Sequence, residues 1–393
     1  MPKISMLFLL CAFLTATFAR DIDVYFHFKA PQAKTICIAM ECMDWEQDAN
    51  PMQKGPDGVF TLKMEINPGE YPYMYVVDGK YWVQDPEAQS IRIENTPASL
   101  LIVGTEAERA AERAVQAGNA DQALQAAQDL RGYDELSQFQ APANFCFGIL
   151  GDCRDGEGIY KALLSKIKEF KGVMVANNGD MVSGPTVYNE WLTFIQDTKN
   201  ADIPFVAALG NHDTKKAADT VWDSKLFKIP QKDFYYSLNF GNCAFFFLNT
   251  EYTKGSFPIS GAQMDWLKSE LSSSTAKNKF VFVHRPLYPL KSQGQHYNDS
   301  LNIYPADRDA LLQLFKDNGV KYIFCGHEHF YNRQTVEGVE NVIVGGAGAP
   351  LYTSAAKGGY YHFVLVTVKN GTVKCEVYKY DSTAGTYQIS DTF

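Results

Sequence analysis

Five short polar motifs, each placed directly after an apolar run, constrain the fold of this chain more than any other feature of its sequence. The motifs are Gly151-Asp152, Gly179-Asp180, Gly210-Asn211-His212-Asp213, His284 and Gly326-His327-Glu328-His329. The apolar runs alternate with amphipathic segments of helical period, which is typical of an α/β fold. Because the strands of such a fold end on one edge of a sheet, we expect the motifs to lie together there, where ligands bind.

The residue types in these motifs favour a metal site. They supply carboxylates, imidazoles and an amide, and four of the seven histidines of the chain fall within them. This mixed set of oxygen and nitrogen ligands suits Zn²⁺, Mn²⁺ or Fe better than Ca²⁺, which prefers oxygen ligands alone. A glycine in front of the polar residue lets the backbone turn sharply without a Cβ clash.

The ordered series of motifs resembles the calcineurin-like metallophosphoesterase superfamily over roughly residues 143–390. The resemblance implies a mixed, two-sheet β-sandwich flanked by helices, with two divalent metal ions at its loop edge, in a domain that we place at residues 143–393. It also implies a metal-dependent phosphoric ester hydrolase whose substrate is a phosphate monoester or diester. In such a site, two cations about 3.5–4 Å apart hold a hydroxide that attacks phosphorus in line.

The resemblance assigns roles position by position. The metal ligands that it implies are Asp152 and His329 for the first metal, Asn211, His284 and His327 for the second, and Asp180 as the bridge between them. His212 is not a ligand in this scheme: it donates a proton to the leaving oxygen, and Asp213 orients its ring. Asn178 is a further residue that could hydrogen-bond to the phosphate.

Arg154 departs from the family pattern, because many members have a histidine ligand at this position. Arginine stays protonated and cannot bind a metal. The favoured interpretation is that the first metal keeps its other ligands and waters while Arg154 clamps a phosphate oxygen; Gly-Asp-x-Arg openings of this kind occur among exported members. Alternatively, Asp155 replaces the missing ligand, or the site holds a single metal and is slow or inactive. The purple acid phosphatase branch has a tyrosine where this chain has Ser183.

The pattern of residues 20–104 predicts a small all-β sandwich of the immunoglobulin-like type, because short alternating segments are separated by turns such as Asp78-Gly79. Its residues resemble the early-set domains of the glycogen-binding and isoamylase type. Trp45 and Trp82 stand at or near the sugar-stacking positions of that family, whereas Met74 occupies the place of its lysine. The domain is either a module that binds an α-glucan or other polysaccharide, or a spacer or dimerisation sandwich.

The remaining segments are a connector and a leader. Residues 105–142 are rich in helix formers, and we expect a helical connector that Gly118-Asn119 breaks into two short helices. Residues 1–19 have the form of a signal peptide, with Lys3 followed by the apolar run Ile4–Leu14. The run is shorter than the ~20 apolar residues of a spanning helix, so we expect a secreted or periplasmic protein with no membrane span.

Composition excludes some functional classes. With 46% apolar and 21% charged residues, the chain is globular rather than disordered. Its 36 basic and 45 acidic residues give a net charge of −9, which disfavours a nucleic-acid scaffold as a partner.

The alternative function is a carbohydrate-surface binding protein whose phosphoesterase domain is impaired through Arg154. His296, in a polar loop, is expected at the surface, with a substrate contact as the alternative.

Overall fold

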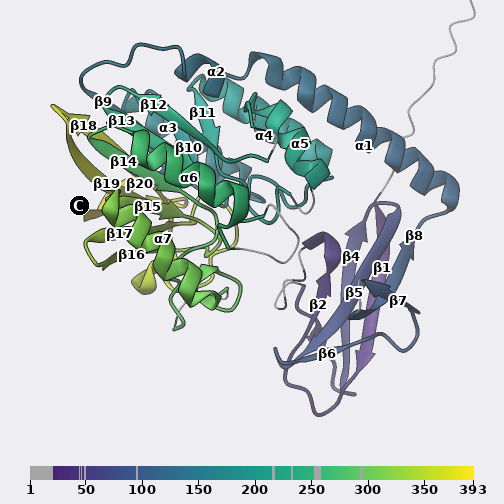
Figure 1. The fold of residues 1–393 in the computed structure, drawn as a ribbon. Helices are drawn as coiled ribbons and strands as arrows, with labels where there is room; N and C mark the ends of the chain where they lie inside the picture. Colours follow the sequence, from purple (N-terminus) through teal and green to yellow (C-terminus); the bar gives the residue numbers. More distant parts are fainter. Residues whose placement is uncertain are drawn as a thin grey trace, which may run out of the picture. The chain divides into compact units, whose positions relative to one another are not determined.

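A computed structural model describes residues 21–393 of the chain except residues 44, 46, 48, 49, 94, 95, 215, 216, 232, 252–257, 293 and 295. The expected signal peptide therefore lies outside the described residues. The chain divides into two compact units (Figure 1): unit 1 comprises residues up to Glu41 and Trp45–Val115, and unit 2 comprises Cys42–Asp44 and Gln116–Phe393. None of the helices in the described part of the chain combines the length and the apolar character needed to cross a membrane.

Unit 1 is built from two antiparallel sheets, which confirms the expected all-β region. The first sheet has the order β1 (Ile22–Lys29), β4 (Val59–Ile66), β3 (Gln53–Lys54). The second has the order β2 (Ile36–Met40), β5 (Gly69–Val77), β8 (Thr96–Val103), β7 (Gln89–Ile93), and β6 (Tyr81–Val83) pairs with β5. The ring of Phe28 on β1 lies 4.5 Å from that of Tyr75 on β5, measured between centroids. The two sheets therefore face each other across an aromatic core.

The segment after unit 1's last strand differs from the expectation. Helix α1 (Glu106–Ala126) is continuous and contains both Gly118 and Asn119. It is followed by the short helices η2 (Ala127–Asp129) and α2 (Tyr133–Leu136). The predicted break at Gly118-Asn119 is wrong, because one glycine costs a helix only about 1 kcal/mol and the alanine- and glutamate-rich flanks outweigh that cost.

The first sheet of unit 2 is mixed. Its order is β11 (Phe205–Ala207), β10 (Val175–Asn177), β9 (Phe145–Leu150), β18 (Tyr361–Lys369), β19 (Thr372–Asp381), β20 (Thr386–Thr392). Strands β9, β10 and β11 run parallel, whereas β18 to β20 join them in antiparallel pairs. The parallel strands are connected by α3 (Glu157–Glu169) and α4 (Tyr188–Ala201), and α5 (Ala217–Leu226) follows β11.

The second sheet of unit 2 is also mixed. Its order is β12 (Tyr236–Phe240), β13 (Cys243–Phe247), β14 (Asn278–Phe282), β15 (Tyr322–Cys325), β17 (Val339–Val344), β16 (Tyr331–Val336). Strands β13, β14, β15 and β17 are parallel, and β12 and β16 form antiparallel edges. Between these strands lie α6 (Gly261–Ser273), η3 (Leu301–Ile303) and α7 (Pro305–Asp317), and η4 (Ala355–Lys357) precedes β18.

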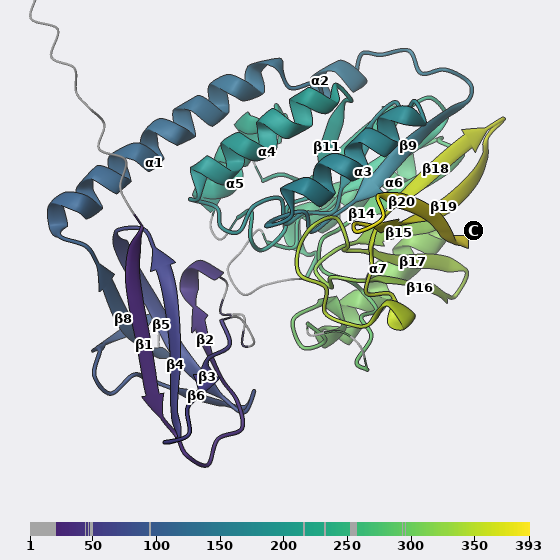
Figure 2. The same cartoon turned by 180° about the vertical axis from the view of Figure 1, so that it is seen from behind.

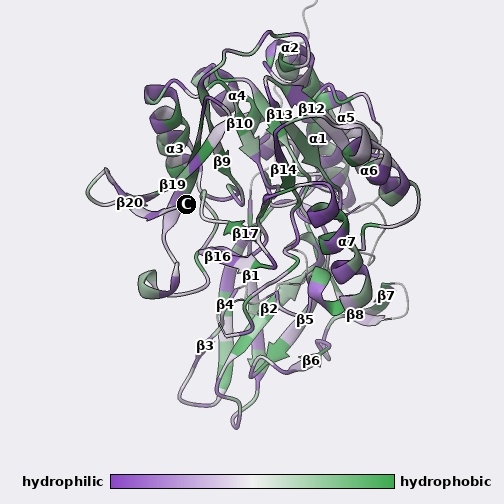
Figure 3. Cartoon of the chain, turned by 60° about the vertical axis from the view of Figure 1, so that its left-hand side comes forward, coloured by the Kyte–Doolittle hydropathy of each residue, from purple (hydrophilic) through white to green (hydrophobic). Residues whose placement is uncertain are grey.

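The two sheets of unit 2 pack face to face. The ring of Phe147 on β9 lies 5.2 Å from Phe245 on β13 and 5.5 Å from Phe280 on β14, between centroids. Helices cover the outer faces: Tyr160 of α3 stacks on Phe194 of α4, and Leu271 of α6 and Phe315 of α7 belong to a second buried cluster with the far face of the second sheet. Figure 2 shows this layering from behind, and Figure 3 shows apolar colour on strands such as β9 and β14 and both colours on α3 and α7. The expected mixed sandwich flanked by helices is confirmed.

The topology places the five motifs on one edge. Strands β9, β10, β11, β14 and β15 end at or shortly before the motifs, whose first residues are Gly151, Gly179, Gly210, His284 and Gly326. The carboxyl ends of parallel strands in a sheet point to the same edge. Segments as far apart as those of Asp152 and His327, 175 residues along the chain, are therefore brought into one loop cluster at this edge.

Candidate metal centre

Three of the motif residues have a strained backbone conformation. Asp152, Asp180 and His327 have positive φ angles of 58°, 56° and 70°. Residues other than glycine rarely adopt this left-handed region, and such outliers cluster at functional sites, where the surrounding structure holds them in place. Each of the three follows a glycine directly, so the strained residue is the one that carries the functional side chain.

The glycines of the motifs contribute space more than flexibility. Of the four motif glycines, only Gly179 has a positive φ, at 99°. A Cβ added to Gly210 would collide with Asp180 Oδ1, and a Cβ added to Gly326 would collide with Asp152 Oδ2. The expectation that glycine permits a sharp turn thus applies at Gly179, whereas Gly210 and Gly326 make room for two carboxylates.

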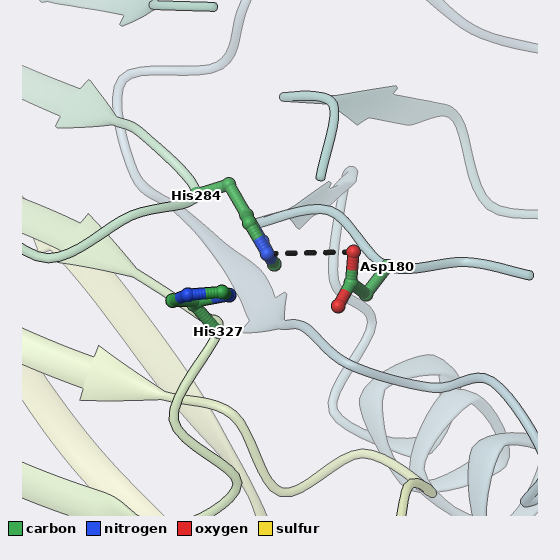
Figure 4. A group of neighbouring side chains, drawn as sticks. All are labelled: Asp180, His284 and His327. Atoms are coloured by element: carbon green, nitrogen blue, oxygen red, sulfur yellow. Dashed lines mark ion pairs between the residues drawn. The ribbon is translucent and has the colours of Figure 1, made fainter. Parts of the chain in front are cut away.

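Two groups of side chains with metal-ligating atoms meet at the edge, and they share Asp180. One group is Asp152, Asp180 and His329, and the other is Asp180, His284 and His327; within each, the ligating atoms lie within 4.8 Å of one another. Asp180 Oδ1 is 3.3 Å from His284 Nε2, and Asp152 Oδ1 is 3.6 Å from His329 Nε2. Figure 4 shows His284 and His327 converging on Asp180. Asn211 Oδ1 joins them, 2.9 Å from His284 Nε2.

Each of the three histidines in these groups has one ring nitrogen held by a backbone carbonyl. His284 Nδ1 lies 2.8 Å from Asn178 O, His327 Nε2 lies 2.9 Å from Asp299 O, and His329 Nδ1 lies 2.7 Å from Pro350 O. A carbonyl oxygen only accepts, so we assign the ring proton of His284 and of His329 to Nδ1. Their Nε2 then presents a lone pair, as in metal-binding histidines whose second nitrogen is anchored. His327 Nε2 differs, because it faces both the carbonyl of Asp299 and the guanidinium Nη1 of Arg285.

The lone pairs and carboxylates at this edge require positive charge. With Nδ1 of His284 protonated, its Nε2 faces the oxygens of both Asn211 and Asp180, all of them acceptors. Burial by itself would lower the pKa of His284, but the carboxylates of Asp180, Asp152 and Glu251 together outweigh burial and raise the pKa to about 10. Burial raises the pKa of Asp152 to about 8. A divalent cation would satisfy these groups, and the donor set fits one.

Comparison with known proteins identifies the domain that carries this centre. Residues 147–331 match the family model for calcineurin-like phosphoesterase. These residues form a calcineurin-like phosphoesterase domain. Proteins named Serine/threonine-protein phosphatase CPPED1 are similar to it: the Rattus norvegicus protein is 32% identical over 158 residues, and the Danio rerio protein is 30% identical over 171. The matches cover 38% and 40% of this chain and 49% and 54% of those proteins, so the chain spans about half the length of the curated relatives it matches.

A solved structure shows the same fold. The purple acid phosphatase PPD1 from seeds of yellow lupin (Lupinus luteus) matches with a TM-score of 0.52 and 17% identity, over 95% of this chain and 72% of that chain.

In this chain, Ser183 follows Asp180 by three residues, and its hydroxyl donates to Glu190 at 2.6 Å from Oε1. The phosphoesterase domain thus has no tyrosine at that position.

Asp213 has a different role from the one expected. Its carboxylate accepts hydrogen bonds from the backbone N–H groups of Asp180, Met181 and Gly210, at 2.7–2.8 Å. The ring of His212 instead has its Nδ1 at 2.8 Å from Ser183 O. The prediction that Asp213 orients His212 is therefore wrong: a buried carboxylate needs several donors, and here the backbone of two motif loops supplies them.

Asn178 does not face a phosphate position. It is fully buried, its Nδ2 donates to Cys325 O at 3.2 Å, and its own carbonyl accepts from His284. The predicted phosphate contact is wrong, because the residue directly after β10 turns toward the second sheet and bridges the two sheets. Its contribution to the candidate metal centre is to hold the ring of His284.

Arg154 is buried beside the centre, with 5% of its side chain exposed. Its Nη1 lies 2.7 Å from Asp155 Oδ2, and both residues line a cavity of about 250 Å³. Within the described residues, Asp155 belongs to neither ligand group, and its side chain is 44% exposed. The geometry gives no support to Asp155 as a replacement ligand, and a phosphate contact of Arg154 stays a prediction.

Two further residues lie at the centre: Tyr352, which the sequence did not single out, and His296, for which a substrate contact was the alternative to a surface position. The ring of His296, expected at the surface, lies 4.1 Å from that of His327 between centroids, and its Nε2 lies 3.1 Å from the hydroxyl of Tyr352. Tyr352 stacks on His329 at 4.0 Å. Neither residue follows an apolar run, so the motif pattern carries no signal for them.

A third group of side chains with metal-ligating atoms is paired with a buried arginine. His296, Asp299 and His327 come within 4.8 Å of one another. However, Arg285 Nη1 lies 2.7 Å from Asp299 Oδ1 and 3.1 Å from His327 Nε2, and the same guanidinium pairs with Glu251. Because this buried cation occupies the place that a metal would take, we do not treat the cluster as a metal site.

The two tryptophans singled out in unit 1 lie close together. The indole of Trp45 is 6.4 Å from that of Trp82 between centroids, at an interplanar angle of 64°. Trp45 is half-buried and Trp82 is 40% exposed. Their proximity gives unit 1 a small aromatic surface.

Proposed function

We propose that this chain is a metal-dependent phosphoric ester hydrolase that cleaves a phosphate monoester or diester at a two-metal centre. The observation that carries the proposal is the sharing of Asp180 by the two ligand groups. A carboxylate with one group on each side is suited to bridge two cations, as in two-metal sites that hydrolyse phosphate esters.

The residues that would hold the metals follow from the two groups. Asp152 and His329 would hold one ion, Asn211, His284 and His327 the other, and Asp180 would contact both. When bound, two divalent ions supply Lewis-acid charge and lower the pKa of water, which provides a nucleophile near neutral pH. The mixed oxygen and nitrogen donors favour Zn²⁺, Mn²⁺ or Fe.

Two further side chains of the domain have proposed roles in the reaction. His212 has its Nδ1 held by Ser183 O, so Nε2 is the nitrogen that would pass a proton to the leaving oxygen. The backbone N–H of His212 donates to Asp180 Oδ1 at 3.0 Å, which ties the acid to the bridging carboxylate. Arg154 would clamp a phosphoryl oxygen, since a guanidinium presents two parallel donors to such an oxyanion.

The proposal is tested with chelated protein and a substrate panel. The panel is p-nitrophenyl phosphate, bis-p-nitrophenyl phosphate and a phosphoserine peptide, the last because the curated relatives are named serine/threonine-protein phosphatases. We expect turnover that chelation abolishes and Mn²⁺ or Zn²⁺ restores, and that Asp180→Asn lacks. Asp265→Asn, at an exposed position on α6, is the matched control and should keep full activity. Turnover that survives chelation, or no turnover of any substrate, refutes the proposal.

A carbohydrate-binding function of unit 1 is a second candidate, favoured by the pairing of Trp45 with Trp82. Such indoles stack on sugar rings. If the phosphoesterase centre were impaired through Arg154, this binding would be the main activity of the chain. Retention on an immobilised α-glucan, lost in Trp82→Ala, would support it; equal elution of both proteins would not.

We also propose that the chain is exported, on the form of residues 1–19 alone. In an expressing host, the mature protein should appear outside the cytoplasm. Mass spectrometry should place its new amino terminus near Arg20. Recovery of the full-length chain in the cytoplasm would contradict this.

A further inference from the structure

Ser183 occupies a central position between the proposed acid and a helix. Its carbonyl lies 2.8 Å from His212 Nδ1, which leaves Nε2 as the nitrogen directed to the leaving group. The direction of Nε2 therefore depends on where the carbonyl of Ser183 points. Ser183 lies in the loop between β10 and α4, and its orientation must be fixed by its other contacts.

Those contacts come from the carboxylate of Glu190, in the first turn of α4. The backbone N–H of Ser183 donates to Glu190 Oε2 at 2.7 Å, and its hydroxyl lies 2.6 Å from Oε1 and 2.7 Å from Oε2. Both oxygens of one carboxylate thus hold a single residue. Hydrogen bonds to a charged acceptor are among the stronger ones in proteins.

Helix capping does not explain this use of Glu190. A glutamate at the third helical position usually reaches back to the N–H of the N-cap residue. Here the N-cap is Val187, and Glu190 instead bonds to Ser183, four residues before the cap. The loop also has an independent anchor, because Trp191 Nε1 donates to Pro185 O at 3.3 Å. Because Trp191 already anchors the loop, the contacts of Glu190 do more than hold the loop in place.

We propose that Glu190 is a positioning residue for His212, which fixes the carbonyl of Ser183 and thereby aims His212 Nε2 at the leaving oxygen. This inference rests on the proposed function, in which His212 is the general acid. Glu190 touches neither substrate nor metal ligands in this scheme. Loss of its carboxylate should misdirect the acid and leave the metal centre intact.

The test is the dependence of kcat on the leaving group. Protonation matters little for a good leaving group such as p-nitrophenolate and much for an alkoxide. General acid catalysis contributes about 10²–10⁴-fold, so Glu190→Ala should lower kcat for an alkyl phosphate by about 10- to 100-fold and for p-nitrophenyl phosphate by less than about 3-fold. Metal content and KM should stay unchanged. Glu190→Gln, which keeps the shape of the side chain, provides a second variant if Glu190→Ala folds poorly.

Two further comparisons separate positioning from general support of the fold. Asp197→Asn is the matched control, because Asp197 lies on the same helix and lines the same cavity as Glu190. It should leave the leaving-group dependence at the wild-type value. In a His212→Ala background, Glu190→Ala should have no further effect, since the group that it aims is already absent.

The outcomes distinguish this inference from the proposed function. Equal losses on both substrates, or an undiminished effect of Glu190→Ala in the His212→Ala background, overturn the inference alone. If His212→Ala itself shows no dependence on the leaving group, the proposed acid is wrong and the inference is overturned together with it. Absence of metal-dependent turnover in the wild type refutes the proposed function before either variant is compared.

Discussion

At the scale of single residues, the centre depends on glycines that leave room for carboxylates. A Cβ on Gly210 would collide with Asp180 Oδ1 and come within 2.5 Å of Asp180 N. We therefore expect Gly210→Ala to displace the shared carboxylate, to weaken metal binding by about 10- to 100-fold, and to lower the free energy of unfolding by about 1–3 kcal/mol. Isothermal titration with Mn²⁺ or Zn²⁺ and urea unfolding measure the two effects.

Gly158→Ala is the control for this substitution. Gly158 lies in α3, and a Cβ there meets no heavy atom within 4 Å. Alanine in a helix should keep metal affinity and raise stability by up to about 1 kcal/mol. If both variants bind metal like the wild type, Gly210 does not protect the position of Asp180.

The buried ring of His362 predicts a pH-dependent stability. Its Nδ1 lies 2.8 Å from Tyr360 O, its Nε2 is buried with no hydrogen-bond partner among the described residues, and burial lowers its pKa to about 4. Between an unfolded pKa of about 6.5 and this value, the unfolded chain binds a proton that the folded chain does not. The free energy of unfolding should therefore fall as pH drops through this window, by at most about 3 kcal/mol from this residue.

His362→Asn isolates that effect, because asparagine keeps an N–H donor and does not titrate. Urea unfolding of both proteins at several pH values between 4 and 7 provides the measurement. The variant should be less stable throughout and should lose less stability toward low pH. Parallel curves would show that His362 does not remain neutral in the folded protein.

The sequence predicted single residues correctly where a side chain with ligand atoms directly follows a strand. The residues that follow strand ends and carry ligand atoms, such as Asp180 and His284, meet as expected. The expected partners of Asp213 and Asn178 were wrong, because side-chain hydrogen bonds depend on which backbone groups a folded loop presents. His296 reaches the centre through a loop whose path has no local pattern.

At the scale of elements, α1 provides a test of helix continuity. Gly118 lies inside this helix, and a Cβ there would meet no heavy atom within 4 Å. Gly118→Ala should raise the free energy of unfolding by about 0.5–1 kcal/mol, since alanine loses less backbone entropy. Circular dichroism during thermal unfolding gives the change.

Gly319 offers a matched control after α7. Its added Cβ would also meet nothing within 4 Å, but its φ is +70°, which suits glycine. Gly319→Ala should lower stability by about 1 kcal/mol, because alanine is strained there. A destabilising Gly118→Ala would instead favour the broken helix that the sequence suggested.

Strands that form buried apolar runs were predictable from the sequence. Exposed strands, which are defined only by their hydrogen bonds to a neighbouring strand, were not. Strands such as β9 and β14 are buried on both faces and stand out as apolar runs. In contrast, β20 is mostly exposed, and β3 consists of two exposed residues. Their strand conformation comes from hydrogen bonds to β19 and β4, partners that local sequence does not reveal.

At the scale of the whole molecule, strand order is the part that sequence could not give. Strand β18 pairs with β9, although more than 200 residues separate them in the chain. This pairing extends the parallel strands β9 to β11 into a six-stranded mixed sheet. Periodicity alone predicted an α/β fold. The two-sheet sandwich was predicted only from the family that the order of the motifs resembles. It did so because the ligands of one centre must share one edge.

The most direct test of the account is the metal content of purified protein, measured by mass spectrometry after dialysis against metal-free buffer. A shared Asp180 predicts two divalent ions per chain in the wild type, as in other two-metal sites. Asp152→Asn should lose one ion, and Asp180→Asn should lose both. Two ions retained by Asp180→Asn, or none bound by the wild type after reloading with Mn²⁺ or Zn²⁺, would contradict the account.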